Sequence, residues 1–352
     1  MRALETLPKA HLHLHFTGSM RTSTLLELAE AHGVRLPAAL SGQHMLNLSP
    51  DARGWFRFQR LYDAARSCVR TVEDMRRIVL EAAADDAAEG SRWLELQVDP
   101  TSYAVHVGGI TPALEIVLDA AREATALTGT AVAVVVAASR IRHPLDARTL
   151  ARLAARHAGD GPGAVVGFGL SNDERRGSTA DFAAAFDIAR RAGLASVPHS
   201  GELLGPAHVR EALSTLRPDR LGHGVRCAED PDLLRRVVDS GVALEVCPAS
   251  NVSLGVYGDL GSVPLRRLLE AGATVALGAD DPLLFGPRLV AQYRSAREDH
   301  GLDDAALAGL AKASITASRA PAAVKRALHA EVDDWLSAAP DGAGGLTGAA
   351  AT

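Results

Sequence analysis

The 352-residue chain is poor in cysteine, in aromatic residues and in long apolar runs, and each shortage excludes a class of protein. Its three cysteines, Cys68, Cys227 and Cys247, lie far apart and include no CxxC pair. We therefore expect no disulfide framework, a reducing cytoplasmic location, and any metal to be held by histidine and carboxylate. The longest apolar run, Ala131–Ala138, is too short to span a bilayer, and the N-terminus lacks the apolar segment of a signal peptide.

The chain also lacks the clustered positive charge that binding to nucleic acids or anionic lipids would need. The formal net charge is −5, with no basic stripe, and aromatic residues make up 4% of the chain. These features disfavour a nucleic-acid or membrane partner and leave a small molecule as the expected ligand, with an oligomer allowed. No GxGxxG motif follows the first predicted strand, so a dinucleotide-binding fold is disfavoured as well.

The apolar pattern predicts eight strands that alternate with helices. Such alternation indicates a parallel sheet, and eight units over this length predict a closed (β/α)8 barrel of the TIM type. We expect one barrel domain over residues 1–339, with a Gly/Ala-rich disordered tail at 340–352. Residues 36–70 form an aromatic insertion after the first strand, either a lid over a pocket or a packing helix. The predicted strands are Ala10–Phe16, Trp93–Val98, Ala131–Ala137, Ala164–Leu170, Leu194–His199, Arg220–Gly222, Val242–Val246 and Thr274–Leu277.

The first predicted strand carries an alternating run of histidine and leucine that ends near Gly18. Because side chains alternate along a strand, the pattern places His11, His13 and His15 on one face and the two leucines on the other. A row of imidazoles on one face is typical of a cation site. The alternative is a set of buried histidines bonded to backbone carbonyls.

Polar side chains also follow most of the later strands, at the edge where a barrel enzyme carries its chemistry. His13 and His15 on the first strand, His199 on the fifth and Asp280 after the eighth make a plausible metal set. Three imidazoles and one carboxylate suit Zn²⁺, and would also suit Fe²⁺ or Mn²⁺. Such an ion can lower the pKa of a bound water to about 7 and so supply hydroxide at neutral pH.

Three further residues at these strand ends have the chemistry to act beside a metal. Glu202 lies three residues after His199 and could exchange a proton with a substrate. His223 lies between two glycines and could orient or deprotonate the attacking water. Asp281 follows a predicted metal ligand, points elsewhere, and could hold the substrate.

In these motifs the chain resembles the adenosine deaminase family of the amidohydrolase superfamily. The matching segments, in order, are His13-Leu14-His15 with Gly18, His199-Ser200-Gly201-Glu202, Arg220-Leu221-Gly222-His223-Gly224 and Asp280-Asp281-Pro282. The resemblance implies a (β/α)8 barrel with one zinc ion on His13, His15, His199 and Asp280. It implies that Glu202 donates a proton to purine N1, that His223 positions the hydroxide, and that Asp281 accepts a hydrogen bond at N7.

The chain departs from the family pattern at two places near the expected substrate. Thr17 stands where adenosine deaminases have an aspartate that binds the ribose 5′-hydroxyl, so that hydroxyl loses a strong acceptor. Asn172 stands where the family has a glycine whose N–H faces purine N3. Ser171 precedes it, and the paired Arg175 and Arg176 that follow could lie near an acidic substituent or belong to a solvated loop.

Both departures fit a purine nucleoside whose 5′ end carries a group other than hydroxyl. The segments resemble the branch of 6-amino-6-deoxyfutalosine deaminases, which implies conversion of that compound to futalosine in menaquinone biosynthesis. An adenosine or adenine deaminase is the first alternative. A metal-dependent amidohydrolase acting on a non-purine substrate is the second, and a non-catalytic binding protein on the same scaffold is the third.

Overall fold

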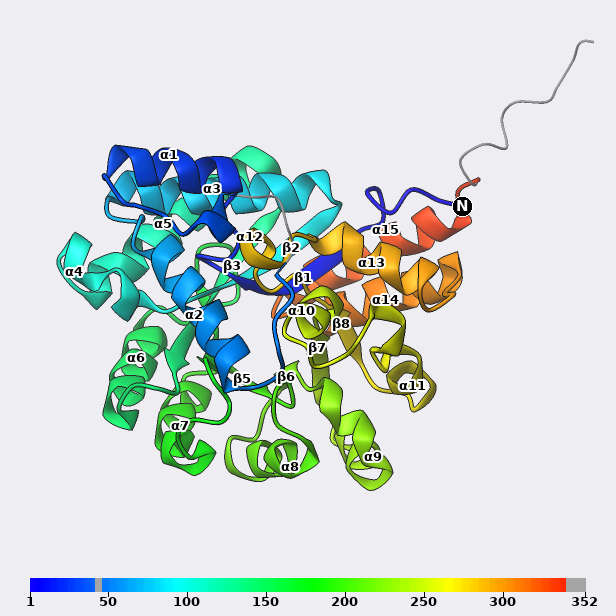
Figure 1. Ribbon diagram of the computed structural model, residues 1–352. Helices are drawn as coiled ribbons and strands as arrows, with labels where there is room; N and C mark the ends of the chain where they lie inside the picture. Colours follow the sequence, from blue (N-terminus) through cyan, green and yellow to red (C-terminus); the bar gives the residue numbers. More distant parts are fainter. Residues whose placement is uncertain (42–45, 340–352) are drawn as a thin grey trace, which may run out of the picture.

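Eight parallel strands stand at the centre of the molecule, in the order β1 to β8 (Figure 1). The computed structural model describes residues 1–41 and 46–339, so the tail predicted at 340–352 lies outside the described residues. The strands are β1 (Lys9–His15), β2 (Ser91–Val98), β3 (Ala131–Ser139), β4 (Val165–Ser171), β5 (Ala195–Ser200), β6 (Arg220–His223), β7 (Ala243–Val246) and β8 (Val275–Leu277).

The first and last strands meet where the chain leaves β8. Leu14 and Asp280 form a parallel bridge. The N–H of Asp280 donates to the carbonyl of His13, and the N–H of His15 donates to the carbonyl of Asp280, both at 3.0 Å. The predicted (β/α)8 barrel is therefore confirmed, and the contact that joins its ends lies at predicted metal ligands.

Helices surround the strands on the outside of the barrel (Figure 1). No helix among residues 1–41 and 46–339 is long and apolar enough to cross a membrane. The α-helices are α1 (Thr22–Ala31), α2 (Ala52–Arg66), α3 (Val72–Ala88), α4 (Ala104–Val107), α5 (Ile110–Thr128), α6 (Pro144–Arg156), α7 (Ala183–Arg191), α8 (Pro206–Thr215), α9 (Pro231–Asp239), α10 (Pro248–Ser253), α11 (Leu265–Glu270), α12 (Pro282–Phe285), α13 (Leu289–Glu298), α14 (Asp304–Ala317) and α15 (Ala322–Ser337). Short 3₁₀ turns are η1 (Ala38–Leu40), η2 (Pro100–Ser102), η3 (Thr179–Phe182), η4 (Val225–Glu229) and η5 (Leu260–Ser262).

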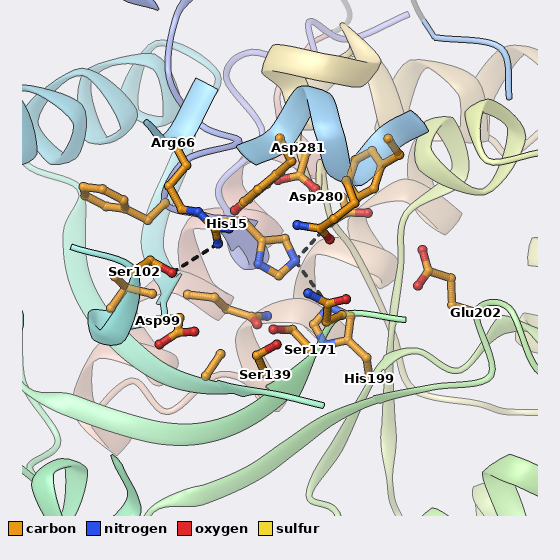
Figure 2. A pocket seen from close by; sticks show the side chains of 18 of the residues that line it. His15, Arg66, Asp99, Ser102, Ser139, Ser171, His199, Glu202, Asp280 and Asp281 are labelled. Carbon is orange, nitrogen blue, oxygen red and sulfur yellow. Dashed lines mark hydrogen bonds and ion pairs between the residues drawn. The ribbon is translucent and has the colours of Figure 1, made fainter. Parts of the chain in front are cut away.

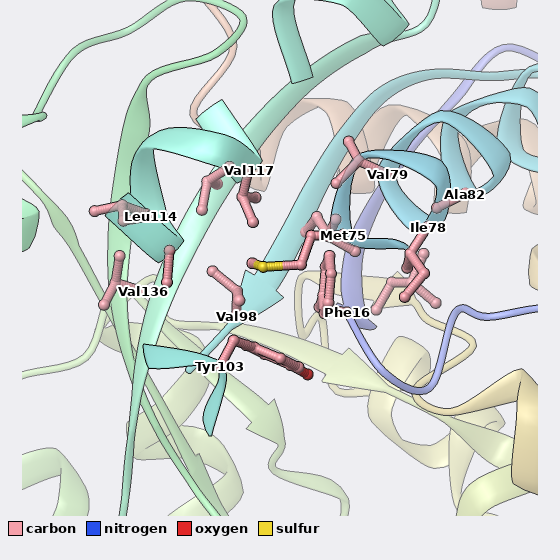
Figure 3. Close-up of a cluster of buried hydrophobic side chains, with 14 of the residues drawn as sticks. Phe16, Met75, Ile78, Val79, Ala82, Val98, Tyr103, Leu114, Val117 and Val136 are labelled. Carbon is pink, nitrogen blue, oxygen red and sulfur yellow. The ribbon is translucent and has the colours of Figure 1, made fainter. Parts of the chain in front are cut away.

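The apolar core between the strands and helices follows the predicted pattern. Met75 and Ile78 of α3 pack with Val98 of β2 and Val117 of α5 in one buried cluster (Figure 3). Helix α3 begins at a capping box, in which the Thr71 hydroxyl accepts from the Asp74 N–H and the Asp74 side chain accepts from the Thr71 N–H. All three cysteines are free and buried, in agreement with the prediction that none is in a disulfide.

Strand β1 departs from the strict alternation that its sequence predicts. His11 pairs with Leu94 and Leu14 pairs with Leu96, so β1 has one residue more than β2 over this interval. This β-bulge reverses the side-chain alternation, since an extra residue shifts all later side chains to the other face. The prediction that three histidines share one face is therefore wrong for His11, and Leu12 and Leu14 belong to different core clusters.

His11 instead has a structural role. Its Nε2 accepts from the Ala279 N–H at 3.0 Å, so Nδ1 carries the proton and donates to Asp86 of α3 at 3.0 Å. The pair is buried. His11 thus ties β1 both to the segment after β8 and to a surrounding helix, as in the alternative of a satisfied core histidine.

A buried chain of charges crosses the interior of the barrel. Arg220 at the start of β6 donates to Glu95 of β2 at 2.5 Å and to Glu245 of β7 at 2.6 Å. A third donor of the same guanidinium reaches the Ala317 carbonyl at 3.0 Å. These side chains are 0–1% exposed, so each charge depends on the others for compensation.

We predict that Arg220→Met lowers the free energy of unfolding by about 3–5 kcal/mol, because it leaves two buried carboxylates without their cation. Urea denaturation followed by circular dichroism measures the change. Arg235→Met is the control, because Arg235 forms an exposed ion pair with Asp232 and should contribute about 0–1 kcal/mol. Equal losses in the two variants would contradict the interpretation.

Candidate functional site

A pocket opens at the carboxyl ends of the strands, where the sequence predicts the chemistry (Figure 2). Its empty space is about 750 Å³, including the open mouth. The predicted site residues that line it are His15, Ser171, Asn172, His199, Glu202, His223, Asp280 and Asp281.

The four predicted metal ligands come together at one side of this pocket. Asp280 Oδ1 lies 3.1 Å from His15 Nε2 and 3.6 Å from His13 Nε2. His199 Nε2 lies 3.2 Å from His15 Nε2. The potential ligand atoms of His13, His15 and Asp280 all lie within 4.8 Å of one another, as do those of His13, His199 and His223. Such a group can hold one divalent cation.

Cys247 adds a thiol to this neighbourhood, which the sequence did not predict. Its Sγ lies within 4.8 Å of potential ligand atoms of His223 and Asp280. Burial, followed by the charge of Asp280, raises the pKa of Cys247 well above its usual value. Because only a thiolate binds a metal strongly, the histidines and Asp280 remain the better ligand set.

His13 is held in one orientation by a carboxylate that sequence reasoning missed. Its Nδ1 lies 2.7 Å from Glu245 Oε2, while its buried Nε2 has no hydrogen-bond partner among residues 1–41 and 46–339. A proton shared with Glu245 on Nδ1 leaves the Nε2 lone pair free for a metal, as in carboxylate–histidine–metal triads. One feature of the sequence could have indicated this contact, because Glu245 is the single charged residue in the otherwise apolar segment Val242–Val246.

Asp280 is placed by a strained backbone and a neighbouring hydroxyl. Its φ is +61°, and that of His223 is +60°, both in the left-handed region that residues other than glycine seldom adopt. Ser250 Oγ donates to Asp280 Oδ2 at 2.6 Å. Burial acts to raise the pKa of Asp280, but the imidazoles of His13 and His15 beside it bring this pKa well below its usual value. Asp280 is therefore an anion.

Glu202 lies in the same pocket with the opposite protonation tendency. Its Oε1 is 3.5 Å from His223 Nε2. Burial, followed by the charge of Asp280, raises the pKa of Glu202 well above its usual value. Burial lowers the pKa of His223 to about 4, so this imidazole is neutral near pH 7. The site thus pairs a carboxylic acid with a neutral imidazole, the two protonation states that a general acid and a general base need.

Asp281 has a buried carboxyl oxygen that makes no hydrogen bond to any described residue. It stands at the N-cap position of α12, yet its side chain makes no capping bond, and Oδ1 is buried without a partner in the described part of the chain. A Cβ at Gly18 would come within 1.8 Å of this oxygen, so only glycine allows the carboxyl to pack there. Burial and the adjacent Asp280 raise the pKa of Asp281 well above its usual value.

The remaining predicted substrate contacts divide into two groups. Ser171 and Asn172 line the pocket, and Asn172 has φ +80°, a conformation in which asparagine is the best tolerated substitute for glycine. Thr17 and Arg175 are not among the lining residues. The Thr17 hydroxyl is buried against Tyr103 Oη at 2.5 Å, and Arg175 donates to Asp173 at 2.8 Å.

Sequence reasoning missed much of the far wall of the pocket. Side chains of α2 from the 36–70 insertion line it, and Arg66 Nη1 donates to Ser102 Oγ at 3.1 Å (Figure 2). The aromatic content of the insertion was a signal, but it could not assign individual contacts. The lining aromatics Trp55, Phe58 and Tyr62 belong to the insertion for which a lid was one of the two expectations, whereas the lining residues not predicted include Arg66, Gln97, Asp99, Ser102 and Tyr103.

A barrel with histidines and carboxylates at its mouth is the fold of a metal-dependent amidohydrolase. Comparison with known proteins then identifies the family. The adenosine deaminase family model matches residues 8–335, so the chain belongs to the adenosine deaminase family. A putative adenosine/adenine deaminase of Streptomyces coelicolor is 62% identical over 343 residues, covering 96% of this chain and 99% of that one.

More distant relatives agree in family and fold. An adenine deaminase of Rhizobium leguminosarum bv. trifolii is 34% identical, with 93% of this chain and 99% of that one covered. The crystal structure of an adenine deaminase from Arthrobacter aurescens superposes with a TM-score of 0.85 at 29% identity, covering 94% and 99% of the two chains.

The raised pKa of Glu202 predicts how stability depends on pH. Above pH 4.5 the unfolded chain releases this proton while the folded protein keeps it, so the wild type loses stability as the pH rises toward the folded pKa. Glu202→Gln has no such proton to lose. In chelator-treated protein, we expect the variant's stability relative to wild type to increase from pH 4.5 to pH 8, as measured by denaturant unfolding. A difference that is constant with pH would contradict the raised pKa.

Proposed function

We propose that this enzyme catalyses the zinc-dependent hydrolytic deamination of a 6-aminopurine to the 6-oxopurine and ammonia, with adenosine or adenine as the first candidate substrate. The observation that carries the proposal is Glu202, an acid of raised pKa beside a neutral His223 and a histidine–Asp280 cluster. The names of the relatives, which refer to adenosine and adenine, support the same substrate class.

The residues present fit a zinc ion, which would bind His13, His15, His199 and Asp280. Three imidazoles with one carboxylate are a typical zinc donor set, although Fe²⁺ or Mn²⁺ would also be accepted. The buried Nε2 of His13, free of any hydrogen bond to the described residues, supports this assignment. When bound, the cation would activate a water molecule for attack at C6.

The chain's own residues would move the protons. Glu202, protonated because of its raised pKa, would donate to purine N1 as attack at C6 places charge on the ring. His223, being neutral, would orient the attacking water and accept its proton. The raised pKa of Asp281 changes one expectation, because a protonated carboxyl would donate to N7 rather than accept there.

Two other functions use the same scaffold. Hydrolysis of an amide or ester would need the same metal set, with Glu202 as the acid that protonates the leaving group, but the names of the relatives point to a purine instead. A non-catalytic binding protein would need none of the proton-transferring residues, and Glu202, His223 and Asp281 are all in the pocket. The acid–base residues therefore favour an enzyme over a binding protein, and the relatives' names favour a deaminase over an amide or ester hydrolase.

A substrate panel on metal-free and zinc-reloaded protein tests the proposal. We expect ammonia release and the absorbance shift from amino- to oxopurine with adenosine or adenine, only after reloading, at one zinc per chain. Glu202→Gln should keep its zinc and lose about 10²- to 10⁴-fold in kcat. Turnover of amides without aminopurines, or full activity of the metal-free protein, would contradict the proposal.

A 5′-substituted nucleoside, 6-amino-6-deoxyfutalosine in particular, is the second candidate substrate, which would place the enzyme in menaquinone biosynthesis. The Thr17 hydroxyl is already bonded to Tyr103, so a free 5′-hydroxyl gains no charged acceptor there. The guanidinium of Arg66 lines the pocket and could face an acidic group on the substituent. These observations are the support for the second candidate.

We predict that Thr17→Asp raises kcat/KM for adenosine relative to the 5′-substituted compound by about tenfold, because a carboxylate can accept from the 5′-hydroxyl. Steady-state kinetics on both substrates measure the ratio. Thr17→Val, which removes the hydroxyl without adding charge, is the matched control and should not favour adenosine. An unchanged ratio in Thr17→Asp would argue against any role of this position at the 5′ end.

A further inference from the structure

Glu174 makes an unusual set of contacts just outside the pocket. It lies in the loop after β4, is 1% exposed, and is not among the pocket-lining residues. Its Oε2 accepts hydrogen bonds from three successive backbone N–H groups, those of Glu202 at 3.1 Å, Leu203 at 2.5 Å and Leu204 at 2.8 Å. One carboxylate oxygen therefore holds the segment that carries the proposed proton donor.

This segment has little other support. Residues 202–204 belong to no helix or strand, so their N–H groups lack the partners that regular structure supplies. Gly201, with φ +79°, makes the turn that leads into them. On the carbonyl side, Arg226 donates to Leu203 at 2.6 Å. Glu174 and Arg226 thus hold the segment from opposite sides.

Glu174 is itself fixed as an anion. Burial acts to raise its pKa, but the contact with His208 and the N–H of Leu204 bring the pKa of Glu174 below its usual value. His208 Nδ1 lies 3.2 Å from Oε1, and the other ring nitrogen lies 3.0 Å from Thr179 Oγ1. Arg140 lies near enough for its charge to favour the anion as well. Charge-assisted bonds to an ionised acceptor are stronger than neutral ones.

We infer that Glu174 is a positioning residue for the reaction, which keeps the Glu202 carboxyl in place by binding the three backbone N–H groups of residues 202–204. The inference rests on the proposed role of Glu202 as proton donor. Its consequence is specific: loss of Glu174 should misplace the acid without altering the surfaces that bind the substrate. A small displacement of a reacting group lowers kcat far more than it alters KM.

The test compares Glu174→Gln with a matched variant elsewhere in the chain. Asp74→Asn is that control, because Asp74 also accepts from two backbone N–H groups, of Arg70 and Thr71, and contacts a histidine, His32, at 2.8 Å. Asp74 lies at the start of α3 and lines no part of the pocket. Both variants lose the same kind of buried carboxylate, so a general loss of stability should affect them alike.

We expect Glu174→Gln to lower kcat by about 10- to 100-fold with KM little changed, and Asp74→Asn to leave both unchanged. Hydrogen exchange, read by mass spectrometry on a peptide covering 201–205, should be about tenfold faster in Glu174→Gln, the effect of losing about one charge-assisted bond. An unchanged exchange rate or an unchanged kcat would overturn the inference. So would an equal loss of kcat in Asp74→Asn.

The exchange measurement separates this inference from the proposed function, because it needs no substrate. Faster exchange in Glu174→Gln, with a wild type that deaminates no aminopurine, would refute the proposed function and leave the role of Glu174 in holding the segment supported. If Glu174→Gln does not fold, Glu174→Asp keeps the charge but shortens the side chain. Faster exchange and a lower kcat in that variant would support the inference, and wild-type values would overturn it.

Discussion

The contact between His13 and Glu245 is the interaction on which the rest of the site depends. It joins the buried charges inside the barrel to the first imidazole of the pocket, through a 2.7 Å separation. Glu245 can hold this imidazole because Arg220 holds Glu245, and Arg220 is in turn shared with Glu95 on β2. The chain of contacts thus connects three strands of the barrel to the orientation of one ring nitrogen. Loss of any one of these buried charges would therefore both lower the stability of the fold and misplace the His13 nitrogen that faces the metal site.

Residues with two roles are also found where the barrel closes. Asp280 exchanges backbone hydrogen bonds with His13 and His15, so the residues that bring the first and last strands together are also the residues that face the pocket. The left-handed backbone of Asp280 is sustained by this pairing and by Ser250. A strained residue of this kind persists only where the surrounding structure over-determines it, and here the closure of the barrel provides that constraint.

The sequence predicted the barrel, its eight strands and the residues that meet at its mouth, because strand periodicity and strand ends are local features. The prediction failed where contacts between distant parts of the chain override the local sequence pattern. The bulge in β1 turned His11 outward, and nothing in the alternation of histidine and leucine reveals a bulge that depends on pairing with Leu94 and Leu96. The contributions of Arg66 and Tyr103 to the pocket were equally hidden, since they arise from segments that fold back over the strand ends.

The distribution of protons among the buried acids explains how one small site can hold both anions and acids. Asp280 lies beside imidazoles and accepts from the Ser250 hydroxyl, Glu174 accepts from backbone N–H groups, and the pKa values of both are lowered. Glu202 and Asp281 lie among the same residues without comparable donors, and the anions beside them add to the effect of burial in raising their pKa values. Glu202 and Asp281 therefore stay protonated because the neighbouring anions take up the available hydrogen-bond donors and add negative charge beside them.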